Sequence, residues 1–311
     1  MDSKISLSPD VQETMNRQEF GELVAALRQD LGWTQFHLAE YAELDDAVIS
    51  QIERGVKKHF EPELLFKLVN AFQLTSLERR EFLLAASGLE QKQIVRQPSA
   101  AMATDVFNVR KALDKMVELT GQVRLPAFLG DVYGDVMAAN NIILSFFKLP
   151  PEFVKDADRI PAGYSTVRFN FSKDLLARSH VVDNWDRYAL NSMRTFREHS
   201  LRYRAKPYFK YLMKIFRNQN EYPFFDRYWK MVSSHEQDKE AATDHFSYEH
   251  AEFGPIKYIS SSITSMTSFG ELFLVQYLPL DQTTSQIFEQ LAQQAGQGMQ
   301  TFASWPEKRM P

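Results

Sequence analysis

Histidine and carboxylate side chains gather in one segment of the second half, and this combination could bind a metal ion. His235-Glu236, Asp244-His245 and Glu249-His250 lie within sixteen residues, and imidazole and carboxylate groups are ligands of several divalent metals. The spacing does not match HExxH, the segment is polar, and the last pair falls inside a predicted strand. We therefore predict no metal site here.

Other catalytic chemistry lacks the residues it needs. The chain has no cysteine, which excludes disulfides, thiolate zinc sites and cysteine nucleophiles. It also has no GxSxG, GxxxxGK[ST] or GxGxxG motif, the patterns of nucleophile elbows, phosphate loops and dinucleotide sites. We therefore expect a binding protein with no catalytic residues and no cofactor, rather than an enzyme.

Length and composition fit two globular domains. The 311 residues are 44% hydrophobic and 24% charged, the balance of folded proteins rather than disordered ones. No apolar run approaches the roughly 18 residues of a membrane helix, and the N-terminus lacks a secretory signal. We expect a cytoplasmic protein that makes no membrane contact. Aromatic residues make up 13% of the chain, and most of them follow residue 105.

Apolar residues at helical spacing dominate the first third of the chain. Leu23, Leu27 and Leu31 would share one face of a first helix. Thr34 and Asp45 can cap a second and a third short helix, and capping or Pro signals start two more near residues 61 and 75. These signals predict an N-terminal all-α domain of five helices over residues 1–92.

The run FGELVAALRQDLGWTQFHLAEYAELDDAVISQIERG resembles the helix-turn-helix of the Xre/lambda-repressor family. The resemblance has physical reasons: Ala39 is small enough for two helices to cross closely, Leu44 fills the turn, and Ile49 anchors the third helix. One departure is Glu43, where the family favours Gly. A left-handed backbone at Glu43 would cost on the order of 1 kcal/mol.

The resemblance implies that the third helix enters the major groove of double-stranded DNA. Gln51 can pair with adenine, Ala47 can meet a thymine methyl group, and Asp46 can accept from cytosine. Gln35 resembles the family's phosphate contact, and basic residues after the helix could hold the backbone. The predicted DNA-binding residues are Gln35, Asp46, Ala47, Ser50, Gln51, Arg54, Lys57 and Lys58. The alternative is a helical bundle that uses this face for a protein partner.

Charge gives the DNA-binding prediction no support. The first 95 residues carry ten Lys and Arg against sixteen Asp and Glu, so few phosphates would be neutralised and non-specific affinity would be weak. We therefore expect a homodimer that binds a specific palindromic operator.

A second domain follows a linker. Residues 93–104 are small and polar with one Pro, so we predict a linker there and a second domain over 105–311. A hairpin around Tyr133-Gly134, a helix from Asn140 or Asn141, three further helices and three closing strands predict a five-stranded antiparallel sheet with inserted helices. Before the hairpin, a helix carrying Leu113 and Met116 could dock on its own domain or pair with a second chain; we favour docking.

The motifs GDVYGDVMAANN, RFNFSKD, DNWDRYALNSMRTFREHS, PFFDRYW and LFLVQYLPLD, in this order, resemble the C-terminal ligand-binding domain of MmyB-like transcription regulators. The resemblance implies an α/β PAS-like fold whose pocket holds a small apolar molecule, a fatty acid or a related acyl chain. The predicted function is a transcriptional regulator that senses this ligand. The alternative is a C-terminal protein-interaction scaffold without a ligand.

Rings, Met side chains and arginines are the candidate ligand contacts, because rings and Met suit apolar chains and a guanidinium suits a carboxylate. The same apolar stripes could simply form the domain core, and Arg168, Arg194 and Arg197 could instead be solvated or pair with acidic residues. The predicted ligand-binding residues are Phe128, Met137, Phe147, Arg168, Trp185, Met193, Phe196, Arg197, Phe209, Met213 and Trp229.

Overall fold

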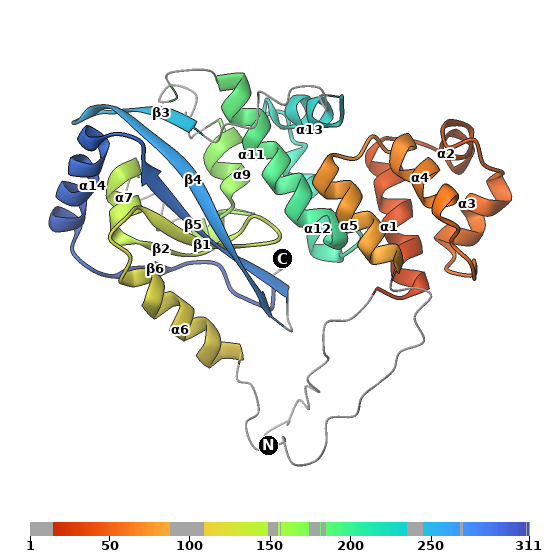
Figure 1. Cartoon of the computed structure of the whole chain (residues 1–311), viewed down its shortest axis with the longest axis horizontal. Helices are drawn as coiled ribbons and strands as arrows, with labels where there is room; N and C mark the ends of the chain where they lie inside the picture. The colour runs from red at the N-terminus through yellow and green to blue at the C-terminus, as the bar shows by residue number, and fades with distance from the viewer. Residues whose placement is uncertain are drawn as a thin grey trace, which may run out of the picture.

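The computed structural model describes residues 15–87, 109–148, 155, 157–173, 181, 185–234, 245–267, 270–308 and 310. A helical unit from the first third of the chain lies beside a larger α/β unit (Figure 1). The predicted linker 93–104, and with it both predicted domain boundaries, lies outside the described residues. No helix among these residues is long and apolar enough to cross a membrane.

The helical unit contains the five predicted helices. They are α1 (Arg17–Asp30), α2 (Gln35–Tyr41), α3 (Asp46–Glu53), α4 (Pro62–Ala71) and α5 (Ser76–Ser87). Thr34 caps α2 as predicted, because its side chain accepts from the backbone N–H of His37. Asp45 precedes α3 at the cap position, but its side chain makes no cap hydrogen bond. The prediction at Asp45 was therefore right about the position and wrong about the bond.

Close packing of α1 against α3 fixes the helix-turn-helix region. Ile49 and Ile52 have no exposed surface, and a Cβ at Gly21 of α1 would lie only 2.3 Å from the carbonyl oxygen of Ile52. The turn between α2 and α3 contains Glu43 at a φ of 51°. The left-handed backbone considered for Glu43 is therefore present.

A six-stranded antiparallel sheet forms the centre of the α/β unit, in the order β3-β4-β5-β1-β2-β6. The strands are β1 (Ala127–Asp131), β2 (Val136–Asn140), β3 (His245–His250), β4 (Gly254–Thr267), β5 (Gly270–Pro279) and β6 (Met299–Thr301). The five predicted strands are all present. The sixth, β6, pairs with β2 and was missed because three residues are too short to show an alternating pattern.

Helices cover both faces of the sheet (Figure 1). α6 (Val109–Gly121) packs on β1, β2 and β6 through Leu113, Met116 and Val117, so the docking that we favoured is present. The other face carries α7 (Asn141–Phe147) and α14 (Gln282–Ala295), whose Ile143, Phe146 and Phe288 join one apolar cluster. No prediction covered α14.

A second group of helices adjoins the same face as α7 and α14. These are α9 (Thr166–Phe171), α11 (Trp185–Ser200), α12 (Pro207–Phe216) and α13 (Phe225–Ser234), with short 3-10 turns at Ala157–Arg159 and Leu201–Tyr203, the latter called η3. Their facing side chains build a separate, ring-rich core around Phe196, Phe209 and Trp229. α11 and η3 also contact α5 of the helical unit.

Candidate functional site

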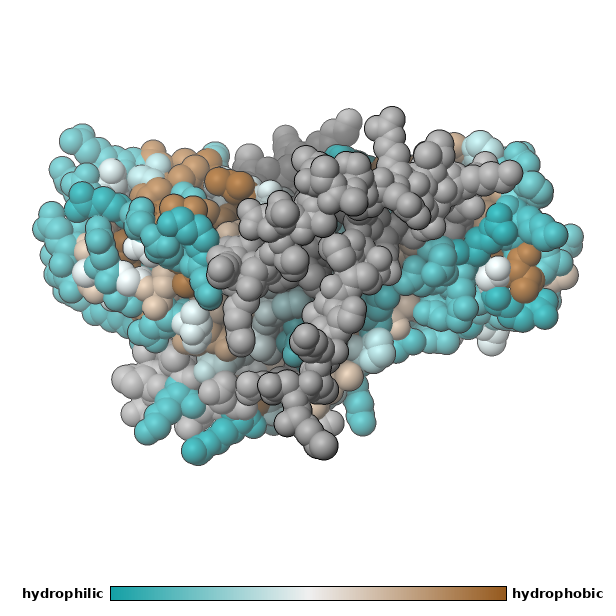
Figure 2. All heavy atoms as spheres, turned by 90° about the horizontal axis from the view of Figure 1, so that it is seen from below, coloured by the Kyte–Doolittle hydropathy of each residue, from teal (hydrophilic) through white to brown (hydrophobic). Residues whose placement is uncertain are grey.

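The first candidate surface is the outer side of α3. Ile49 and Ile52 face the core, whereas Asp46, Ala47 and Gln51 are exposed. Ser50 is half-buried. The predicted base-contacting residues therefore share the side of α3 that points away from the protein. On the face seen in Figure 2, the outer end of the helical unit is mainly hydrophilic, with one small apolar patch.

A polar network that the sequence analysis did not anticipate holds α3 in place. Glu53 at the end of α3 accepts from Arg28 of α1, at 2.6 Å from Nε and 3.0 Å from Nη2. It also accepts from Gln35 Nε2 of α2 at 2.8 Å. Because an amide has two N–H groups, this bond leaves Gln35 a second donor for the predicted phosphate contact. Glu53 thus joins α1, α2 and α3, the helices around the predicted DNA-binding surface.

Positive charge follows the C-terminal end of α3. Arg54 is exposed and donates from Nε to the carbonyl oxygen of Ser50 at 3.2 Å. Lys58 is exposed and Lys57 is half-buried. Asp45 and Asp46 lie at the opposite end of the helix. The surface is therefore basic at one end of α3 and acidic at the other.

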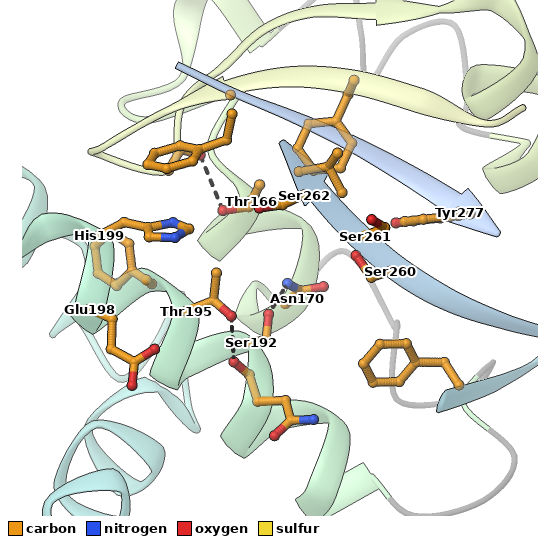
Figure 3. Close-up of a pocket in the computed structure, with 18 of the residues that line it drawn as sticks. Thr166, Asn170, Ser192, Thr195, Glu198, His199, Ser260, Ser261, Ser262 and Tyr277 are labelled. Carbon is orange, nitrogen blue, oxygen red and sulfur yellow. Dashed lines mark hydrogen bonds between the residues drawn. The ribbon is translucent and has the colours of Figure 1, made fainter. Parts of the chain in front are cut away.

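The second candidate site is a cavity of about 630 Å³ in the α/β unit. It lies between the sheet strands β1, β4 and β5 and the helices α9 and α11 (Figure 3). One part of its wall is apolar and includes Phe128, Val132, Phe196, Phe246, Ile259, Phe273, Val275 and Leu278. Another part is polar and includes Thr166, Asn170, Asn191, Ser192, Thr195, Ser260, Ser261 and Ser262. Such a wall suits an amphipathic molecule.

Hydrogen bonds order much of the polar wall. Asn170 links α9 to α11: its Nδ2 donates to Ser192 Oγ at 2.6 Å, and its Oδ1 accepts from Tyr188 at 2.9 Å. Thr166 donates to the carbonyl oxygen of Gly134 at 3.1 Å, which ties α9 to the hairpin turn. In Figure 3 Thr166, Asn170 and Ser192 lie around the same space as the three serines of β4. The polar wall is thus held in position before any ligand binds.

Two carboxylates and one imidazole line the cavity, and burial shifts the pKa of each. Burial lowers the pKa of His199 to about 4, and its ring stacks on Phe273 with centroids 3.9 Å apart. Burial raises the pKa of Glu198 to about 6, although a hydrogen bond from Thr75 opposes the shift. Burial also raises the pKa of Asp131, against the charge of Lys308. Figure 3 shows the His199 ring directed into the cavity and the Glu198 carboxylate pointing away from the strand serines.

Two of the nine predicted apolar ligand contacts line the cavity, and the other seven lie elsewhere. Phe128 and Phe196 line the cavity. Met137 lies on the opposite face of the sheet, beneath α6, and Phe147 packs in the α7 cluster. The others pack against one another in the core of α9, α11, α12 and α13: Trp185, Met193, Phe209, Met213 and Trp229. For these five residues, the structure favours the alternative that they form the domain core.

The predicted arginines are used elsewhere. Arg168 is buried and donates to the carbonyl oxygen of Gly163 at 2.8 Å. Arg197 is buried and binds Glu78 of the helical unit at 3.1 Å, which is the pairing with an acidic residue that we left open. Neither arginine, nor Arg194, is among the described residues that line the cavity.

The polar wall was missed by sequence reasoning. A signal for it exists in the three consecutive serines of β4, where a buried strand would be expected to carry apolar residues on its inner face. Glu198 and His199 were not predicted to line a site because they lie in the last turn of a helix whose apolar stripe was the clearer signal. As for metal ligands, the described residues contain no group of three or more suitable side chains, and His235, Glu236 and Asp244 lie outside them.

Comparison with known families assigns both units. The model of the MmyB-like transcription regulator ligand binding domain matches residues 109–291. The chain belongs to this family. A helix-turn-helix family model matches residues 24–79, which places α2 and α3 in an Xre-type helix-turn-helix domain. A search of curated proteins found no match.

The two assignments together define the class of protein. The helix-turn-helix domain supplies α3 with its exposed polar side, and the ligand-binding domain supplies the cavity between the sheet and α11. The protein is therefore a ligand-responsive transcription regulator.

Proposed function

We propose that this regulator recognises a specific operator through α3 and binds it as a homodimer. The exposed positions of Gln51, Ala47 and Asp46 support base contacts. The acidic balance of the first 95 residues supports dimerisation, because one module with few phosphate contacts binds weakly. Arg54, Lys57 and Lys58 are the proposed backbone contacts.

Selection of bound sequences from a random duplex library tests the operator. We expect an inverted repeat whose half-sites lie about one or two helical turns apart. Light scattering of the complex with the selected duplex should give two protein chains per duplex. A non-repeated site bound by one chain would contradict the homodimer, and an absence of any sequence preference would contradict recognition by α3.

We further propose that the ligand is a small, mainly apolar molecule of the acyl class, held in a PAS-like domain. The observation that carries this proposal is the cavity of about 630 Å³ with rings on one side and hydroxyl groups on the other. The PAS-like assignment is supported by the sheet order, in which the opening hairpin lies beside the last strands, with helices inserted between β2 and β3.

The charge around the cavity favours a ligand with a neutral polar end. Glu198 and Asp131 line the wall, and no Lys or Arg is among the described lining residues. An ionised fatty acid would bring its carboxylate into a partly desolvated site that has no Lys or Arg among its described lining residues to compensate the charge. A protonated acid, an ester, an amide or an alcohol would donate to or accept from Ser260, Ser261 or Thr195 without that cost.

Native mass spectrometry and solvent extraction of purified protein test for the ligand directly. We expect a bound apolar molecule, or a rise in Tm when dodecanol is added, because a ligand that binds only the folded state stabilises it. Dodecanoate at about pH 8 should raise the Tm less than dodecanol, since its carboxylate is then ionised. An absence of bound mass together with an unchanged Tm for both probes would favour the scaffold alternative.

A further inference from the structure

One residue of the helix-turn-helix domain reaches the ligand cavity. Leu77, at the start of α5, lines the cavity together with residues of the sheet and α11. Leu77 is 51% exposed. A ligand in the cavity would cover part of this apolar surface. The position therefore offers the ligand a contact outside its own domain.

The next residue, Glu78, fastens the two domains together. Its carboxylate has no exposed surface and lies between the buried guanidinium groups of Arg197 and Arg204. Arg197 donates from Nε to Oε1 and from Nη2 to Oε2, both at 3.1 Å, while Arg204 also contacts Oε1. Arg197 completes the cluster with a bond to the carbonyl oxygen of Trp229 at 2.8 Å.

The start of α5 also contacts the cavity wall itself. Thr75 donates from Oγ1 to Glu198 Oε1 at 2.9 Å. Glu198 lines the cavity, but this bond holds its carboxylate away from the strand serines (Figure 3). Without the bond, the carboxylate would be able to turn toward the cavity. Thr75 is therefore placed to keep a charged group out of the ligand's space.

Along α11, residues that line the cavity lie next to a residue that binds the helix-turn-helix domain. Thr195, Phe196, Glu198 and His199 line the cavity, and Arg197 between them binds Glu78. A helix is stiff over one turn, so a shift of the cavity wall would also shift Arg197. One rigid turn of α11 thus carries both part of the cavity wall and the arginine that binds the helix-turn-helix domain.

We propose that the ligand site is composite: Leu77 of the helix-turn-helix domain contacts the ligand, and Thr75 and Glu78 position the α11 wall of the cavity. This inference rests on the proposed ligand-binding function. It requires the helix-turn-helix domain to be docked for full ligand affinity. By linkage, the ligand then favours the docked arrangement.

Titration of the full-length protein with dodecanol, followed by displacement of the neutral fluorescent probe Nile red, tests the contact. Leu77→Ala should weaken dodecanol binding by about fivefold, because apolar area is lost from the wall. The matched control is Leu84→Ala, since Leu84 lies on the same helix with 52% exposure but does not line the cavity. It should bind dodecanol within about twofold of the wild type.

Two variants of Thr75 test the positioning role. Thr75→Val removes the hydroxyl at nearly constant shape and should weaken dodecanol binding by about threefold, since the Glu198 carboxylate is released. Thr75→Ser keeps the hydroxyl and should restore binding to within about twofold of the wild type. Circular dichroism at the titration temperature identifies any variant that has unfolded.

The possible failures are distinguishable. If the wild type binds dodecanol and Leu77→Ala binds it equally well, the composite site is wrong while the proposed ligand-binding function stands. Equal losses in Thr75→Val and Thr75→Ser would also overturn the positioning role, because they would not depend on the hydroxyl. If wild-type protein binds neither Nile red nor dodecanol, the proposed apolar ligand class is wrong, and the inference falls with it.

Discussion

Glu78 and Arg197 form an ion pair across the boundary between two domains, with Nε 3.1 Å from Oε1 and both side chains buried. Burial opposes ionisation of Glu78, but the positive charges of Arg204 and Arg197 outweigh it and lower its pKa. The carboxylate therefore stays charged, and the guanidinium groups of Arg197 and Arg204 both depend on it for compensation of their charge.

Glu78→Gln should destabilise the protein by roughly 3 kcal/mol, because Arg197 and Arg204 would lose the charge that compensates them in a buried site. Urea unfolding followed by circular dichroism measures the loss. Glu63→Gln is the control, since Glu63 is exposed and pairs with Lys67 at 3.7 Å, and this substitution should change the free energy of unfolding by less than about 0.5 kcal/mol. Equal effects of the two substitutions would show that burial of the cluster contributes nothing.

Glu43→Gly should stabilise the helix-turn-helix domain by up to about 1 kcal/mol, since Gly adopts a left-handed backbone without the steric cost of a Cβ. Glu43 has a φ of 51°, and its carbonyl oxygen accepts from Lys67 Nζ at 3.3 Å, a bond that Gly would keep. Glu43→Ala separates the backbone effect from the loss of charge and should not stabilise. The urea midpoint is the readout, and a lower midpoint for Glu43→Gly than for Glu43→Ala would refute this account.

Gln51→Ala should relax base preference at one position of each half-site, at a cost of about 1 to 3 kcal/mol per lost pair. Lys57→Ala should instead weaken binding to all sequences alike and reduce the salt dependence. Competition with single-base variants of the selected operator, at several salt concentrations, distinguishes the two. If both variants lose affinity uniformly across sequences, α3 does not read bases through Gln51.

Acidification should destabilise the protein partly through His199. Its pKa in the folded state, about 4, lies below the ordinary value of 6.5, so the unfolded chain binds a proton more readily between these values. Stability from this residue is therefore present above the ordinary pKa and decreases as the pH falls toward 4. His199→Gln should lose roughly 2 kcal/mol less than the wild type between about pH 7 and pH 5.

The control for this pH effect is His59→Gln, because His59 is exposed.

Glu198 acts in the opposite direction: its folded-state pKa of about 6 exceeds the ordinary 4.5, so its contribution to stability decreases as the pH rises through that interval. Glu198→Gln should therefore steepen the loss on acidification that urea unfolding records. The same pH profile for His199→Gln and wild type would mean that His199 is solvated.

Local pattern was enough to predict the elements that are long and amphipathic. Helical spacing located the five N-terminal helices, and strand-forming runs located five strands. α14 was missed although Asp281 caps it, accepting from Thr284 N at 2.7 Å, and Ile287 and Leu291 lie on its buried face. The cap and the apolar face of α14 are visible in the sequence, whereas the three residues of β6 are too short to show an alternating pattern.

The candidate site was harder to predict than the fold, for a physical reason. Periodicity shows that Met193, Phe209 and Trp229 face inward, but it does not show whether the interior beside them is filled or empty. Here they fill it with one another. Likewise, Arg197 was a plausible carboxylate ligand by chemistry, but its actual partner, Glu78, lies 119 residues away in the sequence, and helical spacing carries no information about that pairing.

The turn of α11 from Thr195 to His199 also constrains how such a regulator can diversify. Four positions that line the cavity, 195, 196, 198 and 199, flank Arg197, which pairs with Glu78, so substitutions that adapt this part of the wall to another ligand would fall beside that ion pair. Relatives with different ligands should therefore vary at positions 195, 198 and 199, while the acidic and basic residues at 78 and 197 persist together or change together. A change of ligand specificity would then leave the ion pair between Glu78 and Arg197 intact.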